Sequence, residues 1–212
     1  MSDSSPLDEG VIKFNADDFI HETLSEHPLI NELNYIRDRL FTMNLIGEYP
    51  IEKIGFGNLS VRLLHPAIDN PNAFIISGTQ TGHIPHLNLE HYTHVVNHEF
   101  HENAISVRGP VQASSESLTH AAVYEAHSDI QCVIHVHSAQ IWQGMLDANM
   151  PHTARTIPYG TPEMAAAVQS IVQHQTSGVL AMAGHEEGVI TYGKSIEEAF
   201  ALCEDLYEQF VS

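Results

Sequence analysis

Residues 130–137 read Ile-Gln-Cys-Val-Ile-His-Val-His, an apolar run of strand length that carries two histidines. Along a strand, neighbouring side chains point to opposite faces and residues two apart share a face. His135 and His137 therefore leave one face, while Ile134 and Val136 point to the other and can fill a core. Two imidazoles on one face are half of a metal site. The alternative is a pair of surface histidines on an exposed strand.

The segments on either side of this strand predict a mixed chain. Apolar residues recur with helical spacing over 26–46, and Ser115, Thr161 and Ser195 are good N-caps. Helices are predicted over 26–46, 115–127, 138–146, 161–174 and 195–211. Further strands are predicted over 58–64, 72–77, 93–100, 105–108, 153–158, 178–183 and 188–192. Because the two types do not alternate strictly, we predict an α/β fold in which helices pack on a central, mostly antiparallel sheet.

The length of 212 residues suits one domain, since single cores commonly grow to about 200–250 residues. Hydrophobic residues make up 43% of the chain, which is enough to build a core. Residues 1–25 are polar and acidic and contain several turn formers. We predict a loose or packed-on N-terminal extension over 1–25 and a single domain over 26–212.

The charge of the chain restricts its partners. It has 27 acidic and 8 basic residues, a formal net charge of −19. Such a surface repels nucleic acids and anionic membranes, so neither is an expected partner. An anion-binding pocket would have to use backbone N–H groups and hydroxyls, because charged donors are scarce.

The sequence also favours a cytoplasmic location. The N-terminus MSDSSPLDEG lacks the basic and apolar regions of a signal peptide. The apolar runs are far shorter than the roughly 18–20 residues of a membrane span. Cys132 and Cys203 lie in apolar stretches and are expected to be buried thiols in a reducing compartment.

Two further stretches carry candidate functional residues. Ser114 and Ser115 precede Glu116 at a predicted helix start, where hydroxyls can help to hold an anion. The alternative is plain capping, because an acidic residue in a first helical turn is favourable in itself. His185 follows Gly184 at the end of an apolar strand and could be a third metal ligand or a loop histidine without a role.

Taken together, in this order and spacing, these stretches resemble the class II aldolase/adducin family. The resemblance covers about residues 30–210. Its motifs are GNLSVR (57–62), ISGTQTG (76–82), SSE (114–116), HVH (135–137), IPYGT (157–161) and GH (184–185).

The resemblance implies a nine-stranded type of α/β/α fold and a four-fold symmetric homotetramer with active sites at subunit interfaces. It implies a divalent metal, usually zinc, on His135, His137 and His185. It implies that Glu116 shuttles protons and can ligate the metal when substrate is absent. In members that use phosphates, the phosphate is held by the elements that correspond here to Gly57, Asn58, Thr81, Gly82, Ser114 and Ser115.

The chain departs from the family pattern at several positions. Ala113 stands where the family often has proline, and the turn SGTQTG differs from that of the phosphate aldolases. The usual His-Gly has become His185-Glu186-Glu187-Gly188, which makes the surroundings of the metal site more acidic. No tyrosine can be assigned as a second proton donor; the candidates are Tyr124, Tyr159, Tyr192 and Tyr207.

We therefore predict a metal-dependent lyase that cleaves a C–C bond, through an enediolate, in a sugar phosphate or a small hydroxy-carbonyl compound. The same site would also support epimerisation or dehydration. A third alternative is a non-catalytic, adducin-like interaction module. A small-molecule substrate is the expected partner, besides the other subunits of the tetramer.

Overall fold

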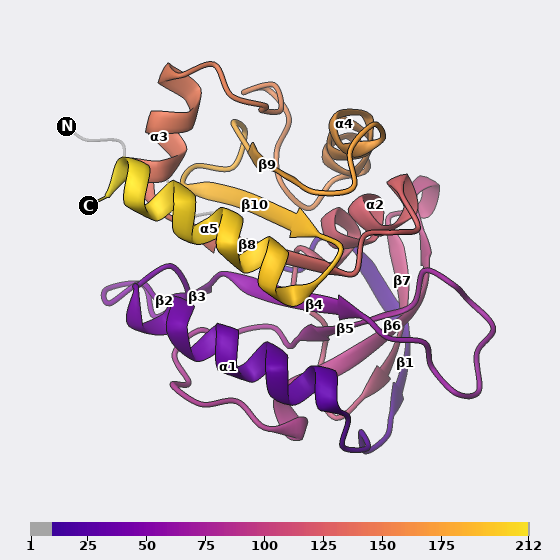
Figure 1. Cartoon of the computed structure of the whole chain (residues 1–212). Coiled ribbons are helices and arrows are strands. Elements are labelled where there is room, and N and C mark those ends of the chain that lie inside the picture. The colour runs from indigo at the N-terminus through magenta and orange to yellow at the C-terminus, as the bar shows by residue number, and fades with distance from the viewer. Residues whose placement is uncertain (1–9, 212) are drawn as a thin grey trace.

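The computed structural model describes residues 10–211. Its centre is an eight-stranded sheet with the order β1-β7-β6-β5-β4-β8-β10-β9 (Figure 1). The strands are β1 (Asn15–His21), β4 (Asn58–Arg62), β5 (Phe74–Ser77), β6 (Tyr92–Glu99), β7 (Ala104–Gly109), β8 (Cys132–His137), β9 (Gly178–Ala181) and β10 (Gly188–Gly193). β1 runs parallel to β7, and the other neighbours in this sheet run antiparallel. The prediction of a mostly antiparallel sheet is confirmed.

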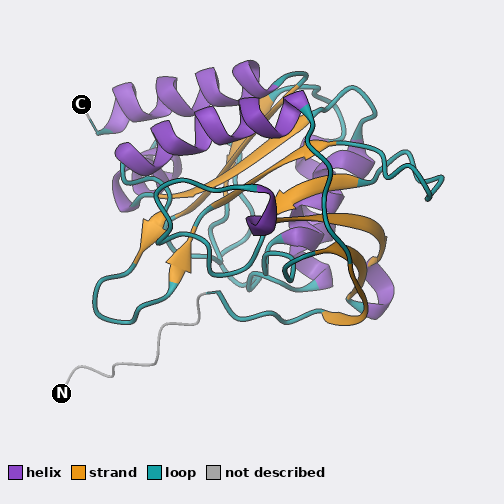
Figure 2. Ribbon diagram, turned by 90° about the horizontal axis from the view of Figure 1, so that it is seen from below, coloured by secondary structure: helices purple, strands orange, loops and turns teal. Residues whose placement is uncertain are grey.

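Helices cover both faces of this sheet. They are α1 (Pro28–Thr42), α2 (Ser117–Ala126), α3 (Ala139–Asp147), α4 (Pro162–Val172) and α5 (Ile196–Phe210). α1, α3 and α5 pack on one face, where α1 and α5 lie side by side (Figure 2), and α2 and α4 pack on the other. The layers are thus α/β/α, as predicted. Within residues 10–211, no helix combines the length and apolarity that a membrane span requires.

The two faces have separate apolar cores, and β8 contributes to both. Ile134 and Val136 lie in the core under α1, α3 and α5. Val133 lies in the core under α2 and α4. Because side chains alternate along a strand, His135 and His137 share the face of Val133 and of α2. This alternation explains why the two histidines lie on the same side of the sheet as the helix that follows Glu116.

Several predicted elements are confirmed by their caps. Thr161 accepts a hydrogen bond from the Met164 backbone N–H, and Ser195 accepts one from that of Glu198. Both cap the helices that they were expected to start. Both cysteines are buried free thiols, also as expected.

The prediction for Ser115 is wrong, because α2 begins at Ser117 with Glu116 in the N-cap position. The Ser114 carbonyl accepts from both the backbone N–H and the hydroxyl of Ser117, so a turn precedes the helix. The N-cap therefore lies one residue later than the hydroxyl pattern suggested.

The predicted strand over 153–158 is also wrong. These residues form turns and loop, with an isolated bridge between His152 and Ala181 before them. Pro151 and Pro158 bound the segment, and neither has an N–H that could extend a ladder beyond the bridge.

Inside the predicted extension, β1 was missed. It pairs with β7 at the edge of the sheet, so this part of the extension is built into the main sheet. Residues 1–9 lie outside the described chain. The sheet has eight strands where the family resemblance implied nine, and β2 (Gly47–Glu48) and β3 (Gly55–Phe56) form a separate pair.

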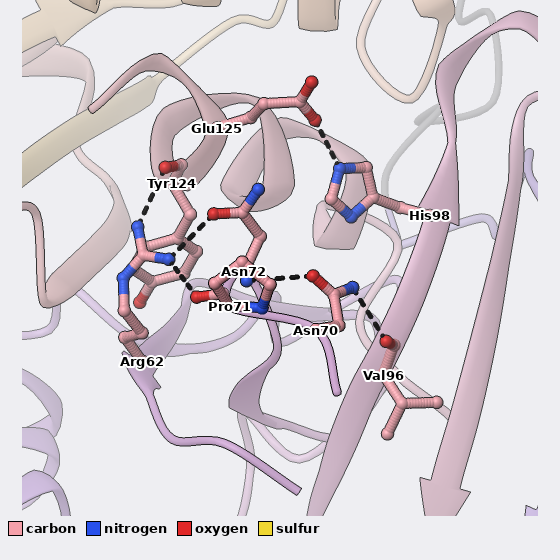
Figure 3. A network of polar contacts seen from close by, with 8 residues as sticks. All are labelled: Arg62, Asn70, Pro71, Asn72, Val96, His98, Tyr124 and Glu125. Atoms are coloured by element: carbon pink, nitrogen blue, oxygen red, sulfur yellow. Dashed lines mark hydrogen bonds and ion pairs between the residues drawn. The ribbon is translucent and has the colours of Figure 1, made fainter. Parts of the chain in front are cut away.

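Arg62, at the end of β4, ties this strand to the far end of α2 (Figure 3). Its guanidinium donates to the carbonyl oxygens of Tyr124, at 2.8 Å, and Pro71, at 2.6 Å, and to Asn72 Oδ1 at 2.9 Å. Charged donors to carbonyls are among the stronger hydrogen bonds of proteins. The bond to Tyr124 holds the end of α2 against β4, and the bonds to Pro71 and Asn72 hold the loop before β5.

Candidate metal centre

Three buried imidazoles converge on the α2 side of the sheet. β8 supplies His135 and His137, and His185 comes from the turn between β9 and β10. β10 pairs with β8 so that Gly188 lies opposite His137, which brings the preceding turn over the two histidines. One ligand nitrogen of each ring lies within 4.8 Å of the others, and the Nε2 atoms of His135 and His137 are 3.0 Å apart.

The surroundings keep these imidazoles neutral. Burial lowers the pKa of His135 to about 4. Burial, and then the neighbouring histidines, hold the pKa values of His137 and His185 well below the ordinary value. Three neutral imidazoles with converging lone pairs are the donor set of catalytic zinc sites. The residues therefore fit a divalent cation with open coordination positions.

Gly188 makes room for this arrangement. A Cβ atom at this position would lie 2.4 Å from Cδ2 of His185 and 3.2 Å from Cε1 of His135. Nδ1 of His135 donates a hydrogen bond to the Val189 carbonyl oxygen, 3.2 Å away. The proton therefore lies on Nδ1, and Nε2 keeps the lone pair. A side chain at position 188 would push two of the three rings apart.

Glu116 is a buried carboxyl whose pKa lies near neutral pH. It is 1% exposed at the start of α2. Burial raises its pKa to about 7, against smaller lowering effects from the Thr119 hydroxyl and the charge of Lys13. Within the described chain, neither carboxyl oxygen has a hydrogen bond of good geometry. Such a group can both take up and return a proton at neutral pH.

α2 packs on the face of the sheet that carries His135 and His137. His120 lies one helical turn after Glu116, and its pKa is lowered by burial and then by the neighbouring His135. The charge of Lys13 affects both Glu116 and His185.

The residues expected to hold a phosphate lie on neighbouring segments. Asn58 pairs with His135 across β4 and β8, and Gly78 is bridged to Ala113, directly before Ser114. The side chains of Asn58, Thr81, Ser114 and Ser115 are buried. The structure therefore brings the three motifs to one end of the sheet, while a common anion pocket stays a prediction.

Two glycines of these motifs are required by their backbones. Gly57 has a φ of 74°, in the left-handed region that favours glycine. A Cβ atom at Gly82 would lie 2.0 Å from the Gly47 carbonyl oxygen. Both positions allow backbone segments to approach one another closely beside Asn58 and Thr81.

Lys13 and Tyr159 were not assigned to the site by the sequence analysis, yet they lie beside it. Lys13 Nζ lies 3.7 Å over the centre of the Tyr159 ring and donates to the Tyr159 carbonyl at 3.4 Å. The Tyr159 ring is 4.5 Å from that of His185. Of the four candidate tyrosines, Tyr159 is thus one that contacts a member of the trio. Lys13 was missed because it belongs to the segment predicted as an extension.

Arg37 is a second residue that was missed. From α1 its guanidinium donates to the carbonyl oxygens of Thr81, Gly82 and Pro85, at 3.1, 3.1 and 2.9 Å. It is 1% exposed. A single arginine on the apolar face of a predicted helix was the available signal. Arg37 holds the turn that carries two of the expected phosphate-binding residues.

Replacing Arg37 with methionine should lower the free energy of unfolding by about 2–4 kcal/mol, because three carbonyls, two of them in buried hydrogen bonds, lose a charged donor. Urea denaturation measures this loss. Arg39→Met is the control, since Arg39 pairs with Glu204 at the surface and should cost less than about 1 kcal/mol. Equal midpoints for the two variants would show that Arg37 does not hold the turn.

Comparisons with known proteins agree with this architecture. The family described as Class II Aldolase and Adducin N-terminal domain matches residues 42–210. The fold is similar to that of YgbL from Klebsiella pneumoniae, described as a putative aldolase/epimerase/decarboxylase, with a TM-score of 0.64 and 20% identity over 87% of each chain. It is also similar to the L-fuculose-1-phosphate aldolase of Thermus thermophilus, with a TM-score of 0.59 and 20% identity over 85% of this chain and 89% of that one.

A third similar structure is a sugar-phosphate aldolase from Thermotoga maritima, with a TM-score of 0.63 and 15% identity over 85% of this chain and 90% of that one. At these identities the likeness shows a common fold. No curated protein sequence matches the chain significantly.

Proposed function

Because the chain belongs to the class II aldolase and adducin N-terminal domain family, we propose that it is a metal-dependent lyase for a sugar phosphate or a small hydroxy-carbonyl compound. The observation that carries the proposal is the trio His135, His137 and His185, whose buried, neutral rings converge. Glu116, at the start of α2, adds a buried carboxyl with a pKa of about 7. We propose Zn²⁺ as the metal, since three imidazoles with open positions suit it.

In this proposal each group of the chain has a separate task. The three histidines hold the cation. A bound divalent cation would polarise the substrate carbonyl and stabilise the enediolate left by C–C cleavage. Glu116 takes up or returns the proton at the reacting carbon, for which its buried carboxyl is suited.

The proposed phosphate site uses neutral donors. Backbone N–H groups at Gly57 and Gly82, with the side chains of Asn58, Thr81, Ser114 and Ser115, would hold the phosphate without an arginine. A nearby helix start adds a favourable field for an anion. This choice of donors is consistent with a chain that has only eight basic residues.

The alternatives share the same residues. Epimerisation and dehydration need the same cation and proton carrier and differ in which bond of the substrate breaks, and fold alone does not decide between them. An adducin-like interaction module has no use for three buried neutral imidazoles and a buried carboxyl, and burying such groups costs stability wherever hydrogen bonds do not compensate it. The site therefore favours an enzyme.

A metal analysis followed by an aldehyde-release screen tests the proposal. We expect about one divalent ion per chain, and aldehyde release from at least one member of a panel of ketoses and ketose phosphates. Turnover without aldehyde release, with an epimer or a dehydrated product instead, would assign one of the alternative reactions. A metal-free protein that is inert towards the whole panel would favour the interaction module.

We also propose that the protein is a cytoplasmic homotetramer with active sites at subunit interfaces. The two buried free cysteines are consistent with a reducing compartment. Sedimentation at micromolar concentration tests the assembly, and a fully active monomer would contradict it.

A further inference from the structure

The two ring nitrogens of His137 have different surroundings. Nε2 faces His135, whose Nε2 lies 3.0 Å away. Nδ1 lies 3.0 Å from the Tyr49 hydroxyl, and the same hydroxyl lies 2.9 Å from Oε2 of Glu187. One side of the ring thus faces the metal centre, and the other faces a tyrosine and a carboxylate.

The hydrogen bonds among these three side chains determine which nitrogen of His137 carries the proton. A carboxylate only accepts hydrogen bonds, so the Tyr49 hydroxyl donates to Glu187. The hydroxyl oxygen can then only accept from His137, which must carry its proton on Nδ1. Nε2 keeps the lone pair that a metal ligand needs.

The pair formed by β2 and β3 holds Tyr49 in place. The Tyr49 backbone N–H donates to Ile54 at 2.9 Å, and the Lys53 N–H donates back to Tyr49 at 2.9 Å. The Tyr49 ring packs on Phe56 with 4.7 Å between ring centres, and Phe56 packs on His137 at 5.6 Å. The hydroxyl is therefore placed by a small packed hairpin.

Glu187 reaches the hydroxyl from an unfavourable backbone conformation. Its φ is 66°, in the left-handed region that favours glycine and is unfavourable for a residue with a Cβ atom. Its carbonyl accepts from the Ser138 N–H at 3.0 Å, which fixes the turn. Glu187 also belongs to the segment where this chain departs from the His-Gly of the family pattern. A glutamate kept in this unfavourable backbone conformation suggests that its side chain has a function.

We propose that Tyr49 and Glu187 are positioning residues that fix the tautomer and orientation of His137 and thereby strengthen binding of the metal. The inference rests on the proposed function, because it presupposes a cation on the three histidines. Partners of this kind orient metal-binding histidines and make them more basic, and their loss typically weakens metal binding by about 10–100-fold.

Zinc affinity of the metal-stripped full-length protein tests this inference, measured by competition with a chromophoric chelator. Tyr49→Phe and Glu187→Gly should each weaken binding by about 10–100-fold. The double variant should bind zinc no more weakly than the weaker-binding single variant, because Tyr49 and Glu187 act on His137 through one series of hydrogen bonds. Glu186→Gln is the matched control, since Glu186 is the exposed neighbour and should leave the affinity unchanged.

The glycine variant separates positioning from a structural role. Glu187→Gly relieves the unfavourable φ, so the melting temperature of the metal-free variant should stay the same or rise while zinc affinity falls. A wild-type affinity in both single variants would overturn the inference and leave the proposed function intact. A wild-type protein that binds no zinc would overturn both.

Discussion

Replacing His135 and His137 together with alanine should abolish metal binding and reduce turnover to background. Two of the three converging imidazoles are lost, and the single imidazole of His185 is too few ligands to hold a divalent cation. Metal content after dialysis and turnover on a substrate found in the screen measure the two effects. His83→Ala with His86→Ala is the control, since both histidines are exposed and should leave metal and turnover unchanged. Stoichiometric metal in the site variant would refute the assignment.

The same variant should change the response of the metal-free protein to acid. Burial lowers the pKa of His135 from its ordinary 6.5 to about 4, so the unfolded chain takes up protons in this interval before the folded chain does. The wild-type protein therefore loses free energy of unfolding as pH falls from 6.5 towards 4. The double variant should lose less over the same interval. Parallel curves from urea denaturation at several pH values would contradict the burial of neutral imidazoles.

Local periodicity was sufficient to predict most of the fold. In β8, alternation placed His135 and His137 on one face, and the structure confirms that Ile134 and Val136 face the opposite core. Caps at Thr161 and Ser195 predicted the starts of α4 and α5. These signals act over a few residues, so a sequence displays them directly.

The errors arose where distant segments decide the structure. β1 is an edge strand that exists because β7, about ninety positions later, lies parallel to it, and its own sequence shows little alternation. Tyr49 contacts His137, and Glu187 contacts Tyr49, from loops, and nothing in the sequence near either residue predicts these contacts. Arg37 likewise acts on a turn more than forty residues away. The three histidines could be singled out from sequence motifs, but the groups that surround them could be found only in the tertiary structure.

Replacing Glu116 with glutamine should separate catalysis from stability. Glutamine cannot accept and return a proton, and a positioned general acid or base typically contributes about 10²–10⁴-fold in rate. The three histidines are untouched, so metal content should stay at the wild-type level. Turnover should therefore fall by this factor in a folded, metal-loaded protein. Turnover equal to that of the wild type would mean that Glu116 is only a helix-start residue.

In the same variant, the thermal stability of the metal-free protein should rise, and it should rise only at higher pH. Burial raises the pKa of Glu116 from its ordinary 4.5 to about 7, so the folded state holds its proton after the unfolded chain has lost it. The carboxyl thus destabilises the metal-free wild-type protein progressively as pH rises from 4.5 to 7, by an amount on the order of 3 kcal/mol at most. Glutamine mimics the neutral acid and avoids this cost. Metal-free Glu116→Gln should melt at a higher temperature than the wild type at pH 8 and at the same temperature at pH 4.5. A lower melting temperature at pH 8 would show that the ionised carboxylate is stabilised in the fold, which would exclude a raised pKa as the basis of its proton transfer.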